Sequence, residues 1–213
     1  MFNILNIVLI AIFSFFVTKI FLDNDKLFNK GNVFKYRGIY LLNLVLHLLL
    51  LNITNDLFEF IMYSIFLTAS LFISYIDKEI KLIPNELVII TLICGVLLSI
   101  SRAIANNSFM PIMYMVINLL IGFMIIFLLI VISRGGMGLG DAKYLAVIAV
   151  LLGYEKAILV LFISSFAGTF YAIYLLATKK GKLKSEIPFG PFLTMGTYCM
   201  IFFENFVYKI FFM

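Results

Sequence analysis

Charged side chains are scarce in this sequence: only 13% of its 213 residues are Asp, Glu, Lys or Arg, whereas 64% are hydrophobic. Soluble domains contain about a quarter charged and about half apolar residues, so the composition indicates an integral membrane protein. The longest polar gap is 23–37, which leaves no separate soluble domain within the sequence. Because the apolar runs are continuous rather than alternating, we expect an all-α, polytopic helix bundle and not a β-barrel.

Cysteine and histidine, the usual metal ligands, are also rare. The two cysteines, Cys94 and Cys199, lie in apolar runs without C-x-x-C spacing, and we interpret them as free thiols packed among helices. The single histidine, His47, has no second His, Cys or carboxylate at metal-ligand spacing. We therefore interpret it as a neutral, hydrogen-bonded packing residue, and we expect no metal and no cofactor.

Long apolar runs are what the sequence does contain. No secretory cleavage pattern is visible near the start, so the first run is expected to remain as a span. Eight transmembrane segments are predicted, namely 3–22, 38–53, 57–76, 85–105, 111–132, 142–152, 155–178 and 190–211. The sixth would reach only about 16 Å, so it either starts earlier, inside the Gly-rich segment, or crosses half of the membrane. A single helix over 142–178 would be about 55 Å long and is excluded.

The distribution of Lys and Arg predicts the orientation of these segments. With both termini outside, thirteen basic residues fall on the inner side and three on the outer side, which is a strong positive-inside bias. Residues 1–56 would then form a two-span hairpin with a short cytosolic loop at 23–37. Residues 57–213 would form a core of six segments.

Two acids are expected at the cytosolic edge of that core. Asp77 ends the third predicted segment and Asp141 follows the fifth, and two crossings between them return the chain to the same face. Two carboxylates in one site share a proton, so one can take a proton from water while the other protonates a carbonyl, as in aspartic proteases. A simpler alternative is that Asp141 pairs with Lys143 or Arg134 at a wet interface.

Three motifs around these acids resemble those of the type IV prepilin peptidase family. GMGLGDAK, which contains Gly138, Gly140 and Asp141, is similar to the family's GxGD motif. IDKEIKLIPN, which begins beside Asp77, resembles its first-aspartate segment, and IPFGPFLTMG (187–196) resembles its third motif. The motifs occur in the family's order and cover roughly residues 70–200.

This resemblance implies a multi-pass aspartic endopeptidase of the cytoplasmic membrane with Asp77 and Asp141 as its catalytic pair. Its partners would be prepilins or pseudopilins, from which it removes a basic leader after a Gly, and membrane lipid, but no nucleic acid. Bifunctional members carry a cytosolic insertion with paired C-x-x-C motifs that bind zinc, and they also N-methylate the product. The corresponding stretch here, 23–38, contains no Cys, so we expect a peptidase without methyltransferase activity.

Other residues near the motifs are candidates for shaping the site. Pro84 is expected as the first residue of the fourth helix, Asn85 to cap or orient that helix, and Lys143 to face solvent or headgroups. In the PFGP turn, Pro188 and Pro191 fix φ while Gly190 supplies freedom between them. Glu79 could substitute as a site acid. The cluster Lys179, Lys180, Lys182 and Lys184 is interpreted as an anchor for anionic lipid.

Two other functions compete with the peptidase interpretation. A small cation transporter or channel could use the same acids, but the sequence shows no convincing internal duplication. A presenilin-like intramembrane protease shares GxGD, but the Pro-Ala-Leu element typical of that class is missing. The sequence leaves the oligomeric state open.

Overall fold

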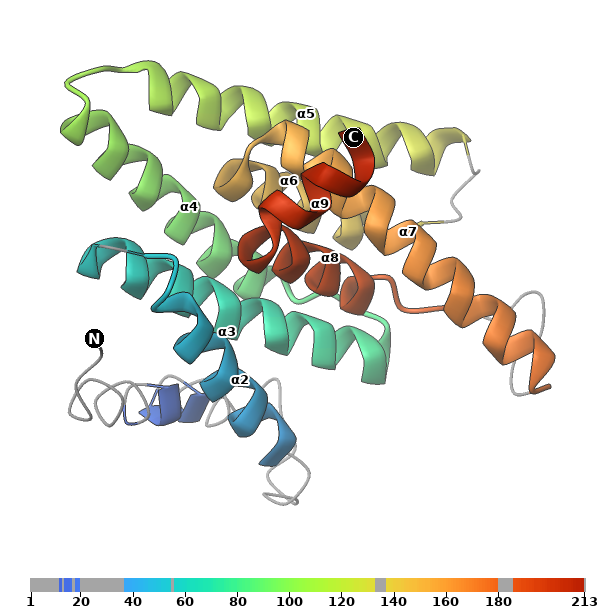
Figure 1. Cartoon of the computed structure of the whole chain (residues 1–213). Helices are drawn as coiled ribbons and strands as arrows, with labels where there is room; N and C mark the ends of the chain where they lie inside the picture. The colour runs from blue at the N-terminus through green and yellow to red at the C-terminus, as the bar shows by residue number, and fades with distance from the viewer. Residues whose placement is uncertain are drawn as a thin grey trace. The chain divides into compact units, whose positions relative to one another are not determined.

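The computed structural model describes residues 12, 14–16, 18–19, 37–54, 56–132, 137–179 and 186–212. In these ranges the regular elements are all α-helices and none is a strand (Figure 1), which confirms the predicted all-α class. The predicted first segment and the loop 23–37 lie largely outside the described residues.

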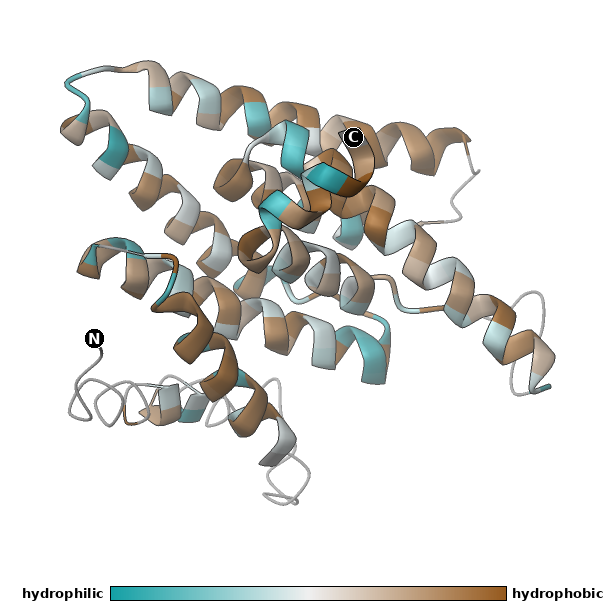
Figure 2. Ribbon diagram, in the orientation of Figure 1, coloured by the Kyte–Doolittle hydropathy of each residue, from teal (hydrophilic) through white to brown (hydrophobic). Residues whose placement is uncertain are grey.

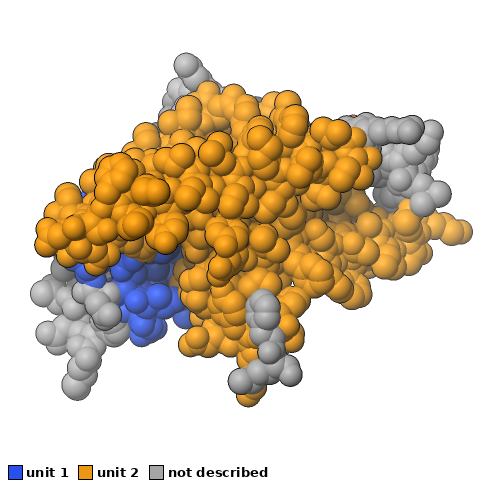
Figure 3. All heavy atoms as spheres, turned by 90° about the horizontal axis from the view of Figure 1, so that it is seen from above, with its two compact units in different colours: residues 1–72 blue, residues 73–213 orange. Residues whose placement is uncertain are grey.

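The chain divides into two compact units, residues 1–72 and 73–213, which Figure 3 colours separately. The boundary falls within helix α3 (Leu57–Ile80). The predicted functional division at residues 56 and 57 stays a prediction.

Buried polar side chains join the helices of unit 1. In α2 (Arg37–Leu50), the Asn43 amide nitrogen donates to the hydroxyl oxygen of Thr18 at 2.8 Å and to that of Thr68, on α3, at 3.1 Å. One turn further on, His47 is buried and its Nδ1 donates to the Asn43 backbone oxygen at 2.7 Å. Hydrogen bonds of this kind between membrane helices contribute about 0.6 kcal/mol each, so they help to fix the packing of this unit.

Four helices in the described part of the chain are long and apolar enough to cross a membrane. They are α3, α4 (Asn85–Ala105), α5 (Met110–Ile132) and α7 (Tyr154–Ala177). In Figure 2 most of α5 has hydrophobic colour, most continuously toward its C-terminal end. The protein is therefore a multi-pass membrane protein, whereas the total of eight segments and the outside position of both termini stay predictions.

The bounds of α4, α5 and α7 agree with the predicted segments to within one residue. The third helix differs, because it continues four residues beyond position 76 and Asp77 lies in its last turn. Residues 77–80, which the predicted segments 57–76 and 85–105 leave as part of a connection, are therefore helical. The chain leaves the helix at Lys81, which has φ 55°, and Pro84 is the extended N-cap of α4 rather than its first residue. This places Asn85 first in the helix.

Helix α6 (Leu139–Leu152) occupies the interior of unit 2. It begins three residues earlier than the predicted segment, inside the Gly-rich stretch, and its length of 14 residues corresponds to about 21 Å. Its neighbours are α4, α5, α7 and α8, and its residues from Tyr144 to Leu151 are all buried. A helix enclosed by protein is not required to match the hydrocarbon thickness, which explains how so short a segment is accommodated. It ends at Gly153 with φ 93°, which confirms that α6 and α7 are separate.

Two glycines allow this close enclosure. A Cβ atom built on Gly122 of α5 would lie 2.6 Å from Ala149 Cβ, and one on Gly95 of α4 would lie 2.7 Å from Val150 Cγ1. Both glycines therefore permit helix axes to approach α6 more closely than any side chain would, as small residues do at membrane helix interfaces.

The last predicted segment is two helices, α8 (Gly190–Phe202) and α9 (Glu204–Phe212), so the single helix expected over 190–211 is wrong. The helix is interrupted at Phe203, with φ −130° and ψ 30°. Glu204 then begins α9, and its carboxylate accepts from the Lys156 amine at 2.7 Å. A carboxylate at a helix N-terminus is favoured by the helix dipole, and the ion pair with α7 stabilises this position.

We expect Gly122→Ala to destabilise the protein by about 1–3 kcal/mol, because the added methyl group meets the backbone of α6 and cannot be relieved by side-chain rotation. Thermal unfolding in detergent, followed by a thiol-reactive dye that reports exposure of the buried Cys94 in a Cys199→Ser background, measures the effect.

Gly168→Ala in α7 is the matched control. Its new Cβ would have only ordinary contacts, 3.6 Å from a ring carbon of Phe192, so its unfolding temperature should be unchanged or slightly higher. Equal unfolding temperatures for the two variants would contradict the tight α5–α6 contact.

Candidate active site

Asp77 lies in the last turn of α3 and points at the start of α8. Its side chain is buried, with 5% of its surface exposed. The backbone N–H of Gly190, 113 positions later in the chain, donates to Asp77 Oδ2 at 2.8 Å. A hydrogen bond from an N–H group to a carboxylate is a charge-assisted interaction, so this contact suits an ionised Asp77.

Gly190 is required here for space and not for backbone freedom. A Cβ atom at this position would lie 2.9 Å from Asp77 Oδ2 and 3.1 Å from Asp77 Cβ. Among the described glycines only Gly153 has a positive φ, so the expectation that Gly190 supplies conformational freedom between two prolines is wrong. The absence of a side chain lets the first N–H of α8 reach the acid.

Asp141 is the third residue of α6. Its Oδ2 accepts the backbone N–H of Gly138 at 3.2 Å, and its own N–H donates to the Gly138 carbonyl at 3.1 Å, so the side chain closes the first turn of the helix. Gly140 packs against Ile83, which its Cβ would approach to 3.2 Å. The two motif glycines therefore position the Asp141 carboxylate next to the segment that joins α3 to α4.

The two acids interact electrostatically. Asp141 lies outside the four helices that are long enough to span, and burial raises its pKa to about 6. The negative charge of Asp77 adds to this rise in pKa, while the hydrogen bond from Gly138 opposes it. Asp77 and Asp141, which the sequence placed at one face by topology alone, are thus both buried and near enough for one charge to act on the other.

Lys143 takes no part in this interaction. It is exposed, and its amine donates to the Asn85 side-chain oxygen at 3.2 Å, which links the first turns of α6 and α4. The structure thus gives Asn85 a contact with α6 rather than a capping role, since the N-cap is Pro84. Arg134, the other cation considered for Asp141, lies outside the described residues.

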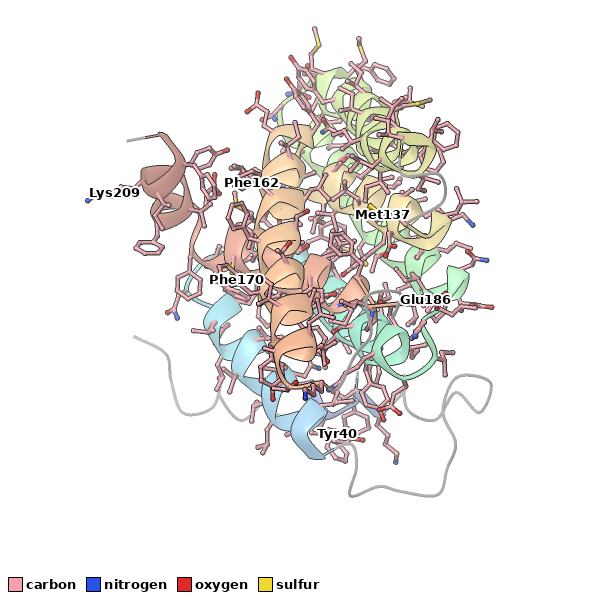
Figure 4. All side chains as sticks on the ribbon, turned by 90° about the vertical axis from the view of Figure 1, so that its right-hand side faces the viewer. Tyr40, Met137, Phe162, Phe170, Glu186 and Lys209 are labelled. Atoms are coloured by element: carbon pink, nitrogen blue, oxygen red, sulfur yellow. The ribbon has the colours of Figure 1, made fainter. Side chains whose placement is uncertain are left out.

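The turn before α8 contains the remaining candidates. Pro188 is half-buried, and Pro191 is the second residue of α8, where the missing N–H of proline is tolerated. Glu186, labelled in Figure 4, lies near the end of α3 and its carboxylate is 3.6 Å from the Lys81 amine. Glu79 is exposed, two residues after Asp77. Of the lysine cluster, only Lys179 is described.

Two hydroxyl side chains beneath the acids do not stand out in the sequence. The hydroxyls of Tyr144, on α6, and Thr194, on α8, are 3.0 Å apart and fully enclosed. Tyr144 follows Asp141, and Thr194 follows Gly190, by about one helical turn. A polar side chain at that spacing within an apolar helix is the signal that would have identified them.

This arrangement can hold and move a proton between two carboxyl groups. A buried pair of acids that share a charge environment titrates as a unit, with one group protonated and the other ionised. Among the described residues, no group of three His, Cys, Asp or Glu side chains is placed to hold a metal ion.

Known proteins with similar sequences carry names that agree with such chemistry. The chain is 28% identical over 129 residues to a prepilin leader peptidase/N-methyltransferase of Aeromonas salmonicida (strain A449), covering 58% of this chain and 43% of that protein. It is 31% identical over 142 residues to the protein of the same name from Burkholderia pseudomallei (strain 1026b), covering 63% of this chain and 44% of the relative. A Pseudomonas putida relative with this name is 26% identical over 141 residues, which cover 64% of this chain and 47% of that protein.

The chain thus spans less than half of the length of these relatives. No solved structure matches it. The sequence model of the type IV leader peptidase family matches residues 64–173, which include both Asp77 and Asp141. Because this match covers 110 of the 213 residues, the protein belongs to the type IV leader peptidase family.

Proposed function

We propose that this protein is an aspartic endopeptidase that removes the basic leader from type IV prepilins or pseudopilins at the cytosolic face of the cytoplasmic membrane. The observation that carries the proposal is the pair of buried carboxyl groups on α3 and α6, one bonded to the first N–H of α8 and the other with a raised pKa. The membership of the family and the names of the relatives support the substrate class.

On the basis of their contacts, we assign the two acids different roles. Asp77 accepts a strong N–H donor and acts as the ionised base, which takes a proton from water as the water oxygen attacks the scissile carbonyl carbon. Asp141, whose pKa is raised, holds the shared proton and donates it to the carbonyl oxygen. When the resulting diol collapses, Asp77 gives the proton taken from water to the amide nitrogen, the C–N bond breaks, and Asp141 recovers its proton from a diol hydroxyl as the new carboxyl group forms. No covalent intermediate with the enzyme is required.

We propose that the protein acts as a peptidase without N-methyltransferase activity, although the relatives' names include both. Residues 23–38 contain no cysteine, so this stretch offers no thiolate ligands for the zinc site that the family resemblance associates with the second activity. The proposed peptidase chemistry depends on neither zinc nor that stretch.

Asp77→Asn and Asp141→Asn should each abolish leader cleavage, by at least about 1000-fold, because an amide keeps the size of the side chain but cannot exchange the proton. The measurement is the shift of a prepilin on a gel after incubation with membranes that contain equal amounts of each variant.

Glu79→Gln is the matched control, since Glu79 is an exposed acid two residues from Asp77. It should cleave like the wild type. Efficient cleavage by either Asn variant would contradict the two-carboxyl mechanism and favour the cation-binding alternative.

Cleavage should decline as the pH rises above about 6, because Asp141 then loses the proton that it donates. It should decline again in acid, where both carboxyls are protonated and no base remains, so that kcat/KM against pH is bell-shaped. Samples held at each pH and assayed again near pH 6 control for inactivation. A rate that stays constant well above this pH would show that Asp141 is not the proton donor.

Gly190→Ala should reduce cleavage by about 10- to 100-fold, because the methyl group would lie 2.9 Å from the Asp77 carboxylate and force the start of α8 away from it. The initial rate of prepilin cleavage measures this effect. Gly168→Ala, which adds a methyl group where only ordinary contacts exist, should retain the wild-type rate. Equal rates in the two variants would mean that the contact between α8 and Asp77 is dispensable.

A further inference from the structure

The first two turns of α8 are hydrogen-bonded to three different helices of unit 2. The Gly190 N–H donates to Asp77 of α3 at 2.8 Å, and Thr194 is bonded to Tyr144 of α6 at 3.0 Å. The Ser164 hydroxyl of α7 lies 2.8 Å from the Phe192 carbonyl oxygen. Helix α8 is therefore held in place by polar bonds as well as by packing.

The bond between Tyr144 and Thr194 lies about one helical turn further along α6 and α8 than Asp141 and Gly190. Tyr144 follows Asp141 by three residues on α6, and Thr194 follows Gly190 by four residues on α8. Tyr144 has no exposed surface and Thr194 is 3% exposed. The hydroxyl bond therefore connects α6, which carries Asp141, to α8, whose first N–H binds Asp77.

We propose that Tyr144 and Thr194 are positioning residues that hold α8 against α6, so that the Gly190 N–H stays on Asp77 and the two carboxylates stay within reach of each other. In this role they act through the placement of α8 and not on the substrate. The catalytic consequence rests on the proposed peptidase function, whereas the positioning of the acids can be measured without it. Catalytic groups generally require support of this kind, because displacements of about 1 Å lower rates by about 100-fold.

The neighbouring threonine shows that this cross-helix bond is specific to Thr194. Thr197, one turn later on α8, is also buried, but its hydroxyl donates to the Leu193 carbonyl of the same helix at 2.7 Å. Thr197→Val therefore removes a hydroxyl of the same size and burial without removing a bond between helices. Tyr114→Phe, at an exposed position of α5, is the corresponding control for the tyrosine.

The first test is the kinetics of prepilin cleavage. Tyr144→Phe and Thr194→Val should each lower kcat by about 10- to 100-fold and leave KM within about twofold, because the substrate surface is intact and only the acids are displaced. Thr194→Ser keeps the hydroxyl and should restore most of the rate. Thr197→Val and Tyr114→Phe should behave like the wild type. Thermal unfolding of each variant confirms that the comparison is made on folded protein.

The second test needs no cleavage activity. The infrared band of a protonated carboxyl group, assigned to Asp141 by its loss in Asp141→Asn, should titrate near pH 6 in the wild type. In Tyr144→Phe and Thr194→Val it should titrate at lower pH, because the charge of Asp77 that helps to raise the pKa of Asp141 has moved away. Thr194→Ser and Thr197→Val should keep the wild-type titration.

The two tests separate the two proposals. A shift of the Asp141 titration in both bond-breaking variants supports the positioning role, even if the wild type cleaves no prepilin and the peptidase proposal fails. A titration that is unchanged in either variant overturns the positioning role, even if the wild type is an active peptidase.

Discussion

The hydrogen bond between the Gly190 N–H and the Asp77 carboxylate is the contact on which the candidate site depends. It joins the start of α8 to the last turn of α3, and a Cβ atom at position 190 would lie 2.9 Å from the accepting oxygen, so this close approach favours a residue without a side chain. It also gives a buried carboxylate the donor that it needs inside a membrane protein, where an unpaired charge is strongly unfavourable. The PFGP turn therefore positions the backbone N–H of Gly190 to donate a hydrogen bond to Asp77.

The enclosure of α6 supplies the other half of the arrangement. An acid at the start of a lipid-exposed helix would be solvated by headgroups and water and would titrate normally. Because α4, α5, α7 and α8 surround α6, Asp141 is buried and its pKa is raised to about 6. The same enclosure explains the small residues at Gly95 and Gly122, which let two of these helices approach the central one. The enclosure of α6 in unit 2 thus accounts both for the close helix packing at these glycines and for the raised pKa of Asp141.

The peptidase proposal and the family membership agree, but they rest on different observations. The family follows from similarity over residues 64–173, which ends before α8 begins. The contribution of α8 to the site follows from the structure, through its bonds to Asp77 and to Tyr144. The contact between the hydroxyls of Tyr144 and Thr194 is a further polar contact near the motif residues. The family match does not reveal it, because Thr194 lies outside residues 64–173.

The sequence by itself determined the class of the protein, the bounds of α4, α5 and α7, the separation of α6 from α7, and the proximity of Asp77 to Asp141. These features follow from local composition and from counting membrane crossings, which require no knowledge of packing. Only the tertiary structure decided the continuation of α3 past Asp77, the interruption at Phe203, the spatial role of Gly190 and the bond between Tyr144 and Thr194. Each of these depends on contacts between residues far apart in the chain, and a hydropathy pattern carries no information about which side chains will meet.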